Sequence, residues 1–322
     1  MQVYSQTSME INQTPSGGEI ILRGNCNNHP AKTLRLNIVA SLSQKRVSEV
    51  FHVKLDGQDL ILKQFFGKNP ENTVTTLCRE QEFLSRTMFD GPYQVNRCLY
   101  AFPEIGVVLL EYRVGKTVGT LISSGDSAFR SEIVLKCGNW LKEFGAGRDE
   151  YSCFSPMFWI NYLDKLDLIQ DFEPETAALL DSLRQRLFLQ AKTIAGIMVK
   201  KSALHDDFVG FNLIFNNDII CGIDIQTNNV LPYAKVAARF LTLLHISRPN
   251  RDPAQKYGIS ERDHDSFFAS EVLPHSEYDT SLPFFIGEQI FLRLLESAKK
   301  QKDTHAIKNC AKAFLEDQSC LD

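Results

Sequence analysis

The stretch SALHDDFVGFNLIFNNDIICGIDIQ, residues 202–226, contains the side chains of this sequence that are best suited to chemistry. Two short apolar runs flank the turn-forming letters NND, which predicts a β-hairpin. If Asp218 is the centre of that hairpin, Asn212 and Asp224 lie opposite each other at its open end. One amide oxygen beside one carboxylate is a suitable site for Mg²⁺, because this ion takes few protein oxygens and keeps water and phosphate oxygens as its other ligands.

Asp207 adds a candidate acid–base group to this site. It precedes Asn212 by five residues, so its carboxylate could reach a substrate hydroxyl near the metal and accept its proton. The alternative is that Asn and Asp merely flank turns, as they often do. That alternative explains the NND letters well, but it explains Asp224 poorly, because this carboxylate ends an apolar run.

A second pair of charged residues is expected earlier in the chain. Two β-rich runs surround the turn signal Asp56-Gly57, and alternation puts Lys63 on the same strand face as two apolar neighbours. A buried ammonium needs a partner. The helix predicted over 75–88 carries Glu80 on its apolar stripe, so the two charges could pair. Two surface side chains that keep their charges in water remain the alternative.

The order of the predicted elements indicates an α+β fold with a small β-rich part followed by a larger helical part. Residues 1–35 are polar and are expected to form a partly mobile extension, with a short strand possible at residues 19–22. The N-terminal lobe is then expected over 36–113 and the helical C-terminal lobe over 114–322. Helices are predicted over 131–144, 174–201, 233–246, 283–299 and 303–316.

Composition excludes several classes of protein. The chain has 322 residues and a net charge of −4, which does not give the basic field that a nucleic-acid binder needs. Its eight cysteines include no Cys-x-x-Cys pair, so a structural zinc site is not expected. There is no secretory signal and no run of about 18 apolar residues, so we expect a cytoplasmic protein without a membrane span. The oligomeric state stays open.

Together, His205, Asp207, Asn212 and Asp224 resemble the catalytic loop and metal-binding Asp of the protein-kinase-like fold. The form is closest to the aminoglycoside phosphotransferase and choline kinase branch, which shows His-Gly-Asp-x-x-x-x-Asn followed by Ile-Asp. Here the letters are HDDFVGFN and IDIQ. Further segments agree in order, from about residue 42 to residue 244: LILKQF, CREQEFL, VLLEYRVGKTVGTLI and WLKEFGAGR.

The resemblance implies a two-lobed fold and an ATP- and Mg²⁺-dependent transfer of phosphate to a hydroxyl of a small molecule. In this reading Lys63 contacts the α- and β-phosphates and is held by Glu80. Ser43 and nearby amides cover the phosphates, although SLSQKRVSEVF has no glycine-rich motif. Backbone groups near Glu111 and Arg113 receive the adenine.

The same resemblance makes Asp207 the catalytic base, with His205 supporting its loop and with Asn212 and Asp224 as the Mg²⁺ ligands. Two departures from the pattern stand out. Asp206 replaces the usual Gly and adds a negative charge beside the base. The branch often continues with the letters DLAR, where this chain has AKVAARFL, with Lys235 near that place.

Two other functions remain as alternatives. An atypical protein kinase is disfavoured because no Ala-Pro-Glu segment follows Asp224, and an inactive scaffold has no need for the whole set of functional residues.

The acceptor is open among aminoglycosides, amino alcohols and sugars. Acidic residues in the insert 248–282 could receive a cationic amine, although a solvated loop is the better explanation for most of them. Trp159, Tyr162 and Phe172 could add aromatic surface near an ammonium, but packing in the core explains them at least as well.

Overall fold

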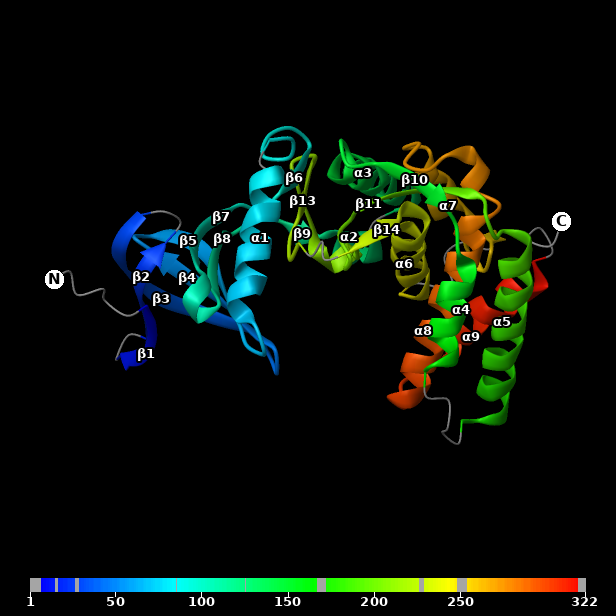
Figure 1. The fold of residues 1–322 in the computed structure, drawn as a ribbon, viewed down its shortest axis with the longest axis horizontal. Coiled ribbons are helices and arrows are strands. Elements are labelled where there is room, and N and C mark those ends of the chain that lie inside the picture. Colours follow the sequence, from blue (N-terminus) through cyan, green and yellow to red (C-terminus); the bar gives the residue numbers. More distant parts are fainter. Residues whose placement is uncertain are drawn as a thin grey trace. The chain divides into compact units, whose positions relative to one another are not determined.

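The computed structural model describes residues 7–14, 17–26, 29–84, 86–124, 126–166, 172–225, 229–247 and 254–317. The chain divides into two compact units (Figure 1). The first comprises Met1–Gly115 with Cys221–Ile223, and the second comprises Lys116–Ile220 with Asp224–Asp322. The division after Gly115 lies close to the expected one near residue 114. The first unit is dominated by strands and the second by helices, which is the α+β organisation that the sequence predicts.

A curled antiparallel sheet forms most of the first unit. Its strands in the described residues follow the order β1-β2-β3-β4-β5-β8-β7. Their bounds are β1 Ser8–Thr14, β2 Gly17–Cys26, β3 His29–Lys45, β4 Ser48–Leu55, β5 Gln58–Phe65, β7 Cys98–Phe102 and β8 Val107–Glu111. The turn between β4 and β5 is Asp56-Gly57, as predicted, and both residues have positive φ, 50° and 84°, which a two-residue hairpin turn of this hand requires.

The N-terminal segment differs from the extension expected over residues 1–35. Its described residues form β1, β2 and the start of β3 and belong to the main sheet. Ile20, Leu22 and Leu34 are almost fully buried there, since alternate side chains of a strand share one face. Thr33 and Arg35, on either side of Leu34, are exposed. The low average hydrophobicity of residues 1–35 therefore did not reveal these strands.

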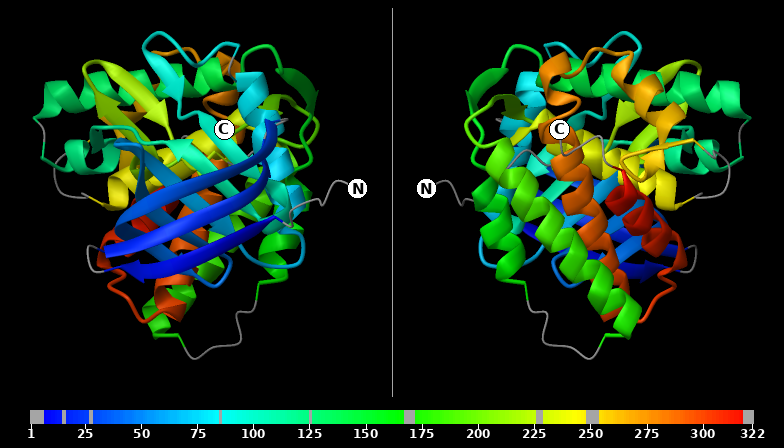
Figure 2. Two further views of the ribbon diagram at one scale, coloured as in Figure 1. Left: turned by 90° about the vertical axis from the view of Figure 1, so that its left-hand side faces the viewer. Right: turned by 90° about the vertical axis from the view of Figure 1, so that its right-hand side faces the viewer.

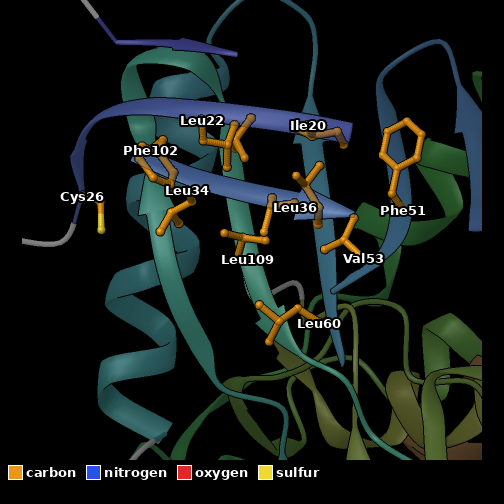
Figure 3. Packing of buried hydrophobic residues seen from close by; sticks show 12 residues of the cluster. Ile20, Leu22, Cys26, Leu34, Leu36, Phe51, Val53, Leu60, Phe102 and Leu109 are labelled. Carbon is orange, nitrogen blue, oxygen red and sulfur yellow. The ribbon is translucent and has the colours of Figure 1, made fainter. Parts of the chain in front are cut away.

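The two faces of this sheet have different neighbours. One face encloses an apolar core that includes Leu36, Val53, Leu60 and Leu109 (Figure 3). β2 also approaches β7, at the far end of the strand order, which shows that the sheet curls. The other face is covered by α1, Pro70–Leu84, and the unit also contains β6, Tyr93–Val95, and the short helix η1, Pro103–Ile105.

Packed helices form the second unit. Figure 2 shows α5, α8 and α9 side by side, and α6 packs on α8 while α3 packs on α7. The bounds are α2 Val118–Ser124, α3 Ser127–Gly145, α4 Pro156–Asp164, α5 Pro174–Thr193, α6 Tyr233–Ile246, α7 Glu261–Phe268, α8 Ser281–Lys299 and α9 His305–Glu316. No helix in the described part of the chain is both long and apolar enough to cross a membrane.

One predicted helix is too long. The apolar stripe predicted a helix over 174–201, but α5 ends at Thr193 and Met198 begins the strand β11, Met198–Ala203. Gly196 interrupts the helix with a φ of 85°, and the following residues pair with β10, Glu150–Cys153, and with β14, Val230–Pro232. Strand pairing therefore overrides the helical spacing.

The predicted hairpin is present as β12, Leu213–Asn216, and β13, Ile219–Gly222. It follows the short helix η2, Gly210–Asn212, and β12 also pairs with β9, Lys116–Thr117. The turn has two residues, both with positive φ, so the hairpin is centred between residues 217 and 218 rather than on 218. The expected register of 212 opposite 224 is therefore shifted by one residue.

The segment around α7 replaces the predicted polar loop at residues 248–282. It contains β15, Gln255–Lys256, β16, Ile259–Ser260, and η3, His275–Glu277. Two of its acidic residues are structural. Asp263 is buried and accepts a bidentate pair from Arg130 at 2.7 and 2.5 Å. Glu277 is buried and accepts from the Lys200 N–H at 2.7 Å and from the Ser281 hydroxyl at 2.6 Å.

A buried histidine on α7 predicts a pH-dependent stability. His264 is 2 % exposed, and burial lowers its pKa below the ordinary 6.5, although a hydrogen bond to Asp265 opposes this. The unfolded chain therefore binds more protons below pH 6.5, and the folded state loses stability as the pH falls. Replacing His264 with Gln should remove this loss, so the unfolding free energies of wild type and variant should converge on acidification.

Urea unfolding across this pH range measures the difference between the two proteins. His305→Gln is the matched control, because His305 is exposed at the start of α9. A constant difference between wild type and His264→Gln at all pH values would contradict the prediction.

Candidate active site

The loop between β11 and η2 carries the predicted acidic residues and is anchored by two buried rings. His205 and Phe208 are both fully buried. The His205 ring centroid lies 6.3 Å from that of Trp140 and 6.2 Å from that of Phe144, both on α3. Phe208 stacks on Trp140 at 5.5 Å. Because the residues on both sides are fixed in the core, the intervening Asp206 and Asp207 are held at the surface of the unit.

Asp207 is fixed by contacts to both of its carboxylate oxygens. The side-chain amide of Asn212 donates to Oδ2 at 3.0 Å and to the backbone carbonyl of Asp207 at 2.9 Å. Arg239, on α6, donates from Nη2 to Oδ1. Each oxygen keeps a further lone pair, so the carboxylate is held in place and can still accept a proton from a hydroxyl.

Asp206, the departure from the expected Gly, has a charge partner in the structure. Arg239 donates from Nη1 to the Asp206 carbonyl at 3.0 Å, and Asn229 donates to its carboxylate at 3.2 Å. Burial raises the pKa of Asp206, while the bond from Asn229 and the charge of Arg239 act in the opposite direction. Arg239 therefore offsets the negative charge of two adjacent carboxylates.

A pocket of about 620 Å³ lies within the second unit beside these residues. Its lining residues come from α4, β14, α6, α8 and the Asp206 loop: Phe158, Trp159, Tyr162, Asp206, Asn229, Val230, Leu231, Lys235, Val236, Arg239, Gln289, Leu292 and Arg293. The volume is in the range of small-molecule sites. Since Arg239 both lines the pocket and contacts Asp207, a molecule bound there lies next to the candidate base.

The expected contributors to an acceptor site are only partly found at this pocket. Trp159 and Tyr162 line it, whereas Phe172 is absent from the described lining. None of the described acidic residues of 248–282 lines it, and Asp252 lies outside the described residues.

The candidate metal ligands are Asn212 at the end of η2 and Asp224 just after β13. The amide nitrogen of Asn212 is used by Asp207, which leaves its carbonyl oxygen as the atom suited to a cation. Asp224 is half-buried and has a φ of 55°, a left-handed conformation that Asp tolerates better than most residues.

The chemistry of these donors fits Mg²⁺, which prefers hard oxygens and accepts few ligands from the protein. No group of three or more His, Cys, Asp or Glu that could hold a metal occurs in the described part of the chain. A cation bound by these two side chains would therefore need phosphate and water oxygens as its remaining ligands.

Within the first unit, Ser43 and Lys63 lie in one row across three strands. Ser43 pairs with Val50, and Val50 pairs with Lys63. Directly opposed residues on antiparallel strands point to the same face of the sheet, so both side chains lie on one face. Lys63 is 9 % exposed, and its ammonium lies 4.9 Å from the centroid of the Phe65 ring.

That face is also the one that α1 covers. Phe65 packs against the same apolar cluster as Leu77 of α1, and Glu80 follows one helical turn later and is half-buried. Lys63 therefore lies on the sheet face that α1 covers, and Glu80 is a half-buried residue of that helix; an ion pair between them stays a prediction.

Glu111 and Arg113, at the end of β8, form an ion pair at 2.9 Å. Arg97 also contacts the Glu111 carboxylate, at 3.2 Å from its Nε. The backbone N–H of Glu111 donates to the Arg97 carbonyl at 2.8 Å, so an adenine at this position would use other backbone groups of the segment.

Arg239 is the site residue that the sequence analysis missed. One signal was available, because Arg239 follows Lys235 by four residues and the two therefore share a face of a helix. The identity of its partner could not be read from the chain, since Asp207 is distant in sequence and meets α6 only in the folded unit.

Solved structures that resemble this fold include phosphotransferases. No family model and no curated protein matches the sequence. A thermostable mutant of aminoglycoside phosphotransferase APH(4)-Ia superposes with a TM-score of 0.56 at 12% identity, over 87% of this chain and 94% of that chain. Spectinomycin phosphotransferase APH(9)-Ia gives 0.51 at 11% identity, over 90% and 95%. A choline/ethanolamine kinase family protein from Mesorhizobium loti gives 0.53 at 12% identity, over 88% and 89%.

These similarities show the fold. The chain has the two-lobed, kinase-like α+β fold, and its solved structural neighbours include aminoglycoside phosphotransferases and a choline/ethanolamine kinase family protein. The fold that the loop residues indicated is thereby confirmed. Fold alone does not fix chemistry, so the activity is argued below from the site.

Proposed function

We propose that this protein is a phosphotransferase that moves the γ-phosphoryl group of ATP to a hydroxyl of a small molecule. One observation carries the proposal: the Asp207 carboxylate is held on both oxygens, by Asn212 and Arg239, beside a pocket of about 620 Å³. Two structural neighbours support it, since one was solved with AMP-PNP and hygromycin B and the other with ADP and spectinomycin.

In the proposed reaction Asp207 orients the acceptor hydroxyl and accepts its proton. The hydroxyl oxygen forms a bond to the γ-phosphorus while the bond from that phosphorus to the oxygen bridging to the β-phosphate breaks, and ADP leaves. Asp207 later releases the proton to solvent. His205 and Asn212 have positioning roles. His205 fixes the loop in the core, and Asn212 fixes the Asp207 carboxylate.

For the nucleotide, we propose that Lys63 contacts the α- and β-phosphates and that Glu80 orients its ammonium. Ser43, on the same sheet face as Lys63, would contribute to covering the phosphates. Backbone groups near Glu111 and Arg113 would bind the adenine. Asn212 and Asp224 would hold Mg²⁺, which offsets negative charge on the phosphates when bound.

Nucleotide binding and transfer are tested in two steps. Thermal unfolding of the full chain is followed with ATP, with and without Mg²⁺, and a panel of hydroxyl compounds is then screened for release of ADP. We expect ATP to raise the melting temperature more with Mg²⁺ than without it. A protein that neither binds ATP nor releases ADP would contradict the proposal and would favour a scaffold. Phosphorylation of peptides alone would favour a protein kinase.

Asp224→Asn should weaken Mg²⁺ binding specifically. Asn tolerates the left-handed backbone at this position but removes the negative charge that a hard cation prefers. We expect the Mg²⁺ concentration that gives half of the maximal ATP-dependent thermal shift to rise about tenfold or more, by analogy with the loss of other residues that support a metal site.

Asp218→Asn is the control for this variant, since Asp218 is an exposed residue of the hairpin turn that also has a positive φ, of 63°. An equal Mg²⁺ requirement in both variants would argue against Asp224 as a ligand.

A further inference from the structure

The charged residues that line the pocket suggest which acceptor it takes. We propose that the acceptor carries a carboxylate or phosphate group in addition to the hydroxyl, and that Arg293, with Arg239, binds this anion. The inference rests on the proposed phosphotransferase function, because it concerns the acceptor of that reaction. Three cationic side chains line the described pocket, Lys235, Arg239 and Arg293, against one acidic side chain, Asp206.

Lys235 is already committed to protein partners. Its ammonium lies 2.6 Å from both carboxylate oxygens of Glu288, which is fully buried. It also lies 4.1 Å from the centroid of the Trp159 ring. We therefore assign Lys235 to the wall of the pocket and not to the anion.

The guanidinium groups of Arg239 and Arg293 are less fully paired with protein groups than the Lys235 ammonium is. Arg239 contacts Asp207, and Arg293 lies 2.7 Å from Glu296. Glu296 is shared, however, because Lys300 also contacts it at 2.6 Å. The Nε atoms of Arg239 and Arg293 are buried, and neither has a hydrogen-bond partner in the described part of the chain.

Arg239 and Arg293 also affect each other. Burial lowers the pKa of Arg293, and the positive charge of Arg239 acts in the same direction, whereas the carboxylates of Glu296, Asp207 and Glu288 act in the opposite direction. Two like charges in a partly buried pocket are costly, and an anion placed between them relieves that cost. Arginine suits this task, because its planar group binds carboxylate and phosphate oxygens in pairs.

The rest of the pocket suits a polyhydroxylated carbon skeleton. Phe158, Trp159 and Tyr162 provide an aromatic wall, on which the apolar face of a sugar-like ring can pack. Asp206 is the one acidic residue in the described lining, and its carboxylate is suited to accept a hydrogen bond from a second hydroxyl. A polyamine, by contrast, would meet the two guanidinium groups and only one carboxylate in the described lining.

The test compares glucose with three of its derivatives that differ in charge: glucuronate, glucose 6-phosphate and glucosamine. Calorimetric titration of the full chain without nucleotide, at fixed ionic strength, measures their dissociation constants. We expect glucuronate or glucose 6-phosphate to bind at least about tenfold more tightly than glucosamine, which corresponds to about 1.4 kcal/mol. The two anions distinguish a carboxylate from a phosphate. If neither binds more tightly than glucose, or if glucosamine binds best, the proposal is wrong.

Three variants identify the anion-binding residue. Arg293→Gln should reduce the preference for the anion about tenfold, whereas Arg293→Lys should retain part of it and also serves as a check on folding. Arg262→Gln, an exposed residue of α7 outside the pocket, should leave the preference unchanged. An unchanged preference in Arg293→Gln would overturn the assignment.

This measurement is independent of the phosphotransfer assay. Failure to bind ATP or to release ADP would contradict the proposed function, whereas an absent anion preference in a protein that does transfer phosphate would contradict only this inference.

Discussion

Asp207→Asn should lower kcat for phosphate transfer by about 10² to 10⁴-fold, the usual contribution of a positioned general base. The amide keeps the size of the side chain and can still accept a hydrogen bond from Arg239, but it cannot take a proton from the acceptor. Binding of ATP and Mg²⁺ should persist, because the proposed metal ligands are Asn212 and Asp224. Steady-state ADP release with the acceptor found in the screen, together with the ATP-dependent thermal shift, measures both effects.

Asp218→Asn is the matched control for this experiment, since it makes the same chemical change at an exposed turn. A kcat in Asp207→Asn that stays within a few-fold of the control value would show that Asp207 is not the base. Loss of ATP binding in Asp207→Asn would instead indicate that the residue acts on the nucleotide.

Lys235→Met should destabilise the protein by about 3–5 kcal/mol, the usual cost of removing one partner of a buried ion pair. Its partner Glu288 is fully buried and receives the ammonium on both oxygens, so the variant leaves a carboxylate in the core without its counter-charge. Urea unfolding followed by circular dichroism gives the free energy of unfolding. Fluorescence is less suitable, because Lys235 lies against Trp159.

The double variant Lys235→Met/Glu288→Leu should recover much of this loss, since no charge then remains buried at the site. Lys300→Met is the surface control: Lys300 pairs with Glu296, but both side chains are about half exposed, so the cost should be about 1 kcal/mol or less. If Lys235→Met and Lys300→Met lower the free energy of unfolding by the same amount, the Lys235–Glu288 pair does not stabilise the protein as proposed.

Much of the site could be predicted because its signals are local. The β4–β5 turn, the face of Lys63 and the β12–β13 hairpin follow from residue types and strand alternation. These properties depend on neighbours a few residues away. The same locality explains the confirmed bounds of α6, which begins at Tyr233 and ends at Ile246.

The wrong predictions concern residues whose structure depends on contacts with segments that are distant in the sequence. Met198 has helical spacing to α5 but pairs with Cys153 as a strand residue, and Ile20 is buried by strands that follow it in the chain. The partner of Asp207 is Arg239, which no spacing rule connects to it. The acidic residues of 248–282 are a further example. Asp263 was a candidate for binding a ligand, but it is paired with Arg130, which is distant in the sequence.

The anchoring of His205 and Phe208 in the aromatic core has a consequence for how the molecule responds to an acceptor. The backbone between them cannot shift without repacking Trp140, so we expect the proposed base, Asp207, to keep its position when an acceptor binds. Arg239 holds the Asp207 carboxylate, so adaptation to an acceptor would have to come from other side chains that line the pocket, such as Arg293 on α8. We therefore expect acceptors of different shape to change side-chain rotamers in the pocket and to leave the loop as it is.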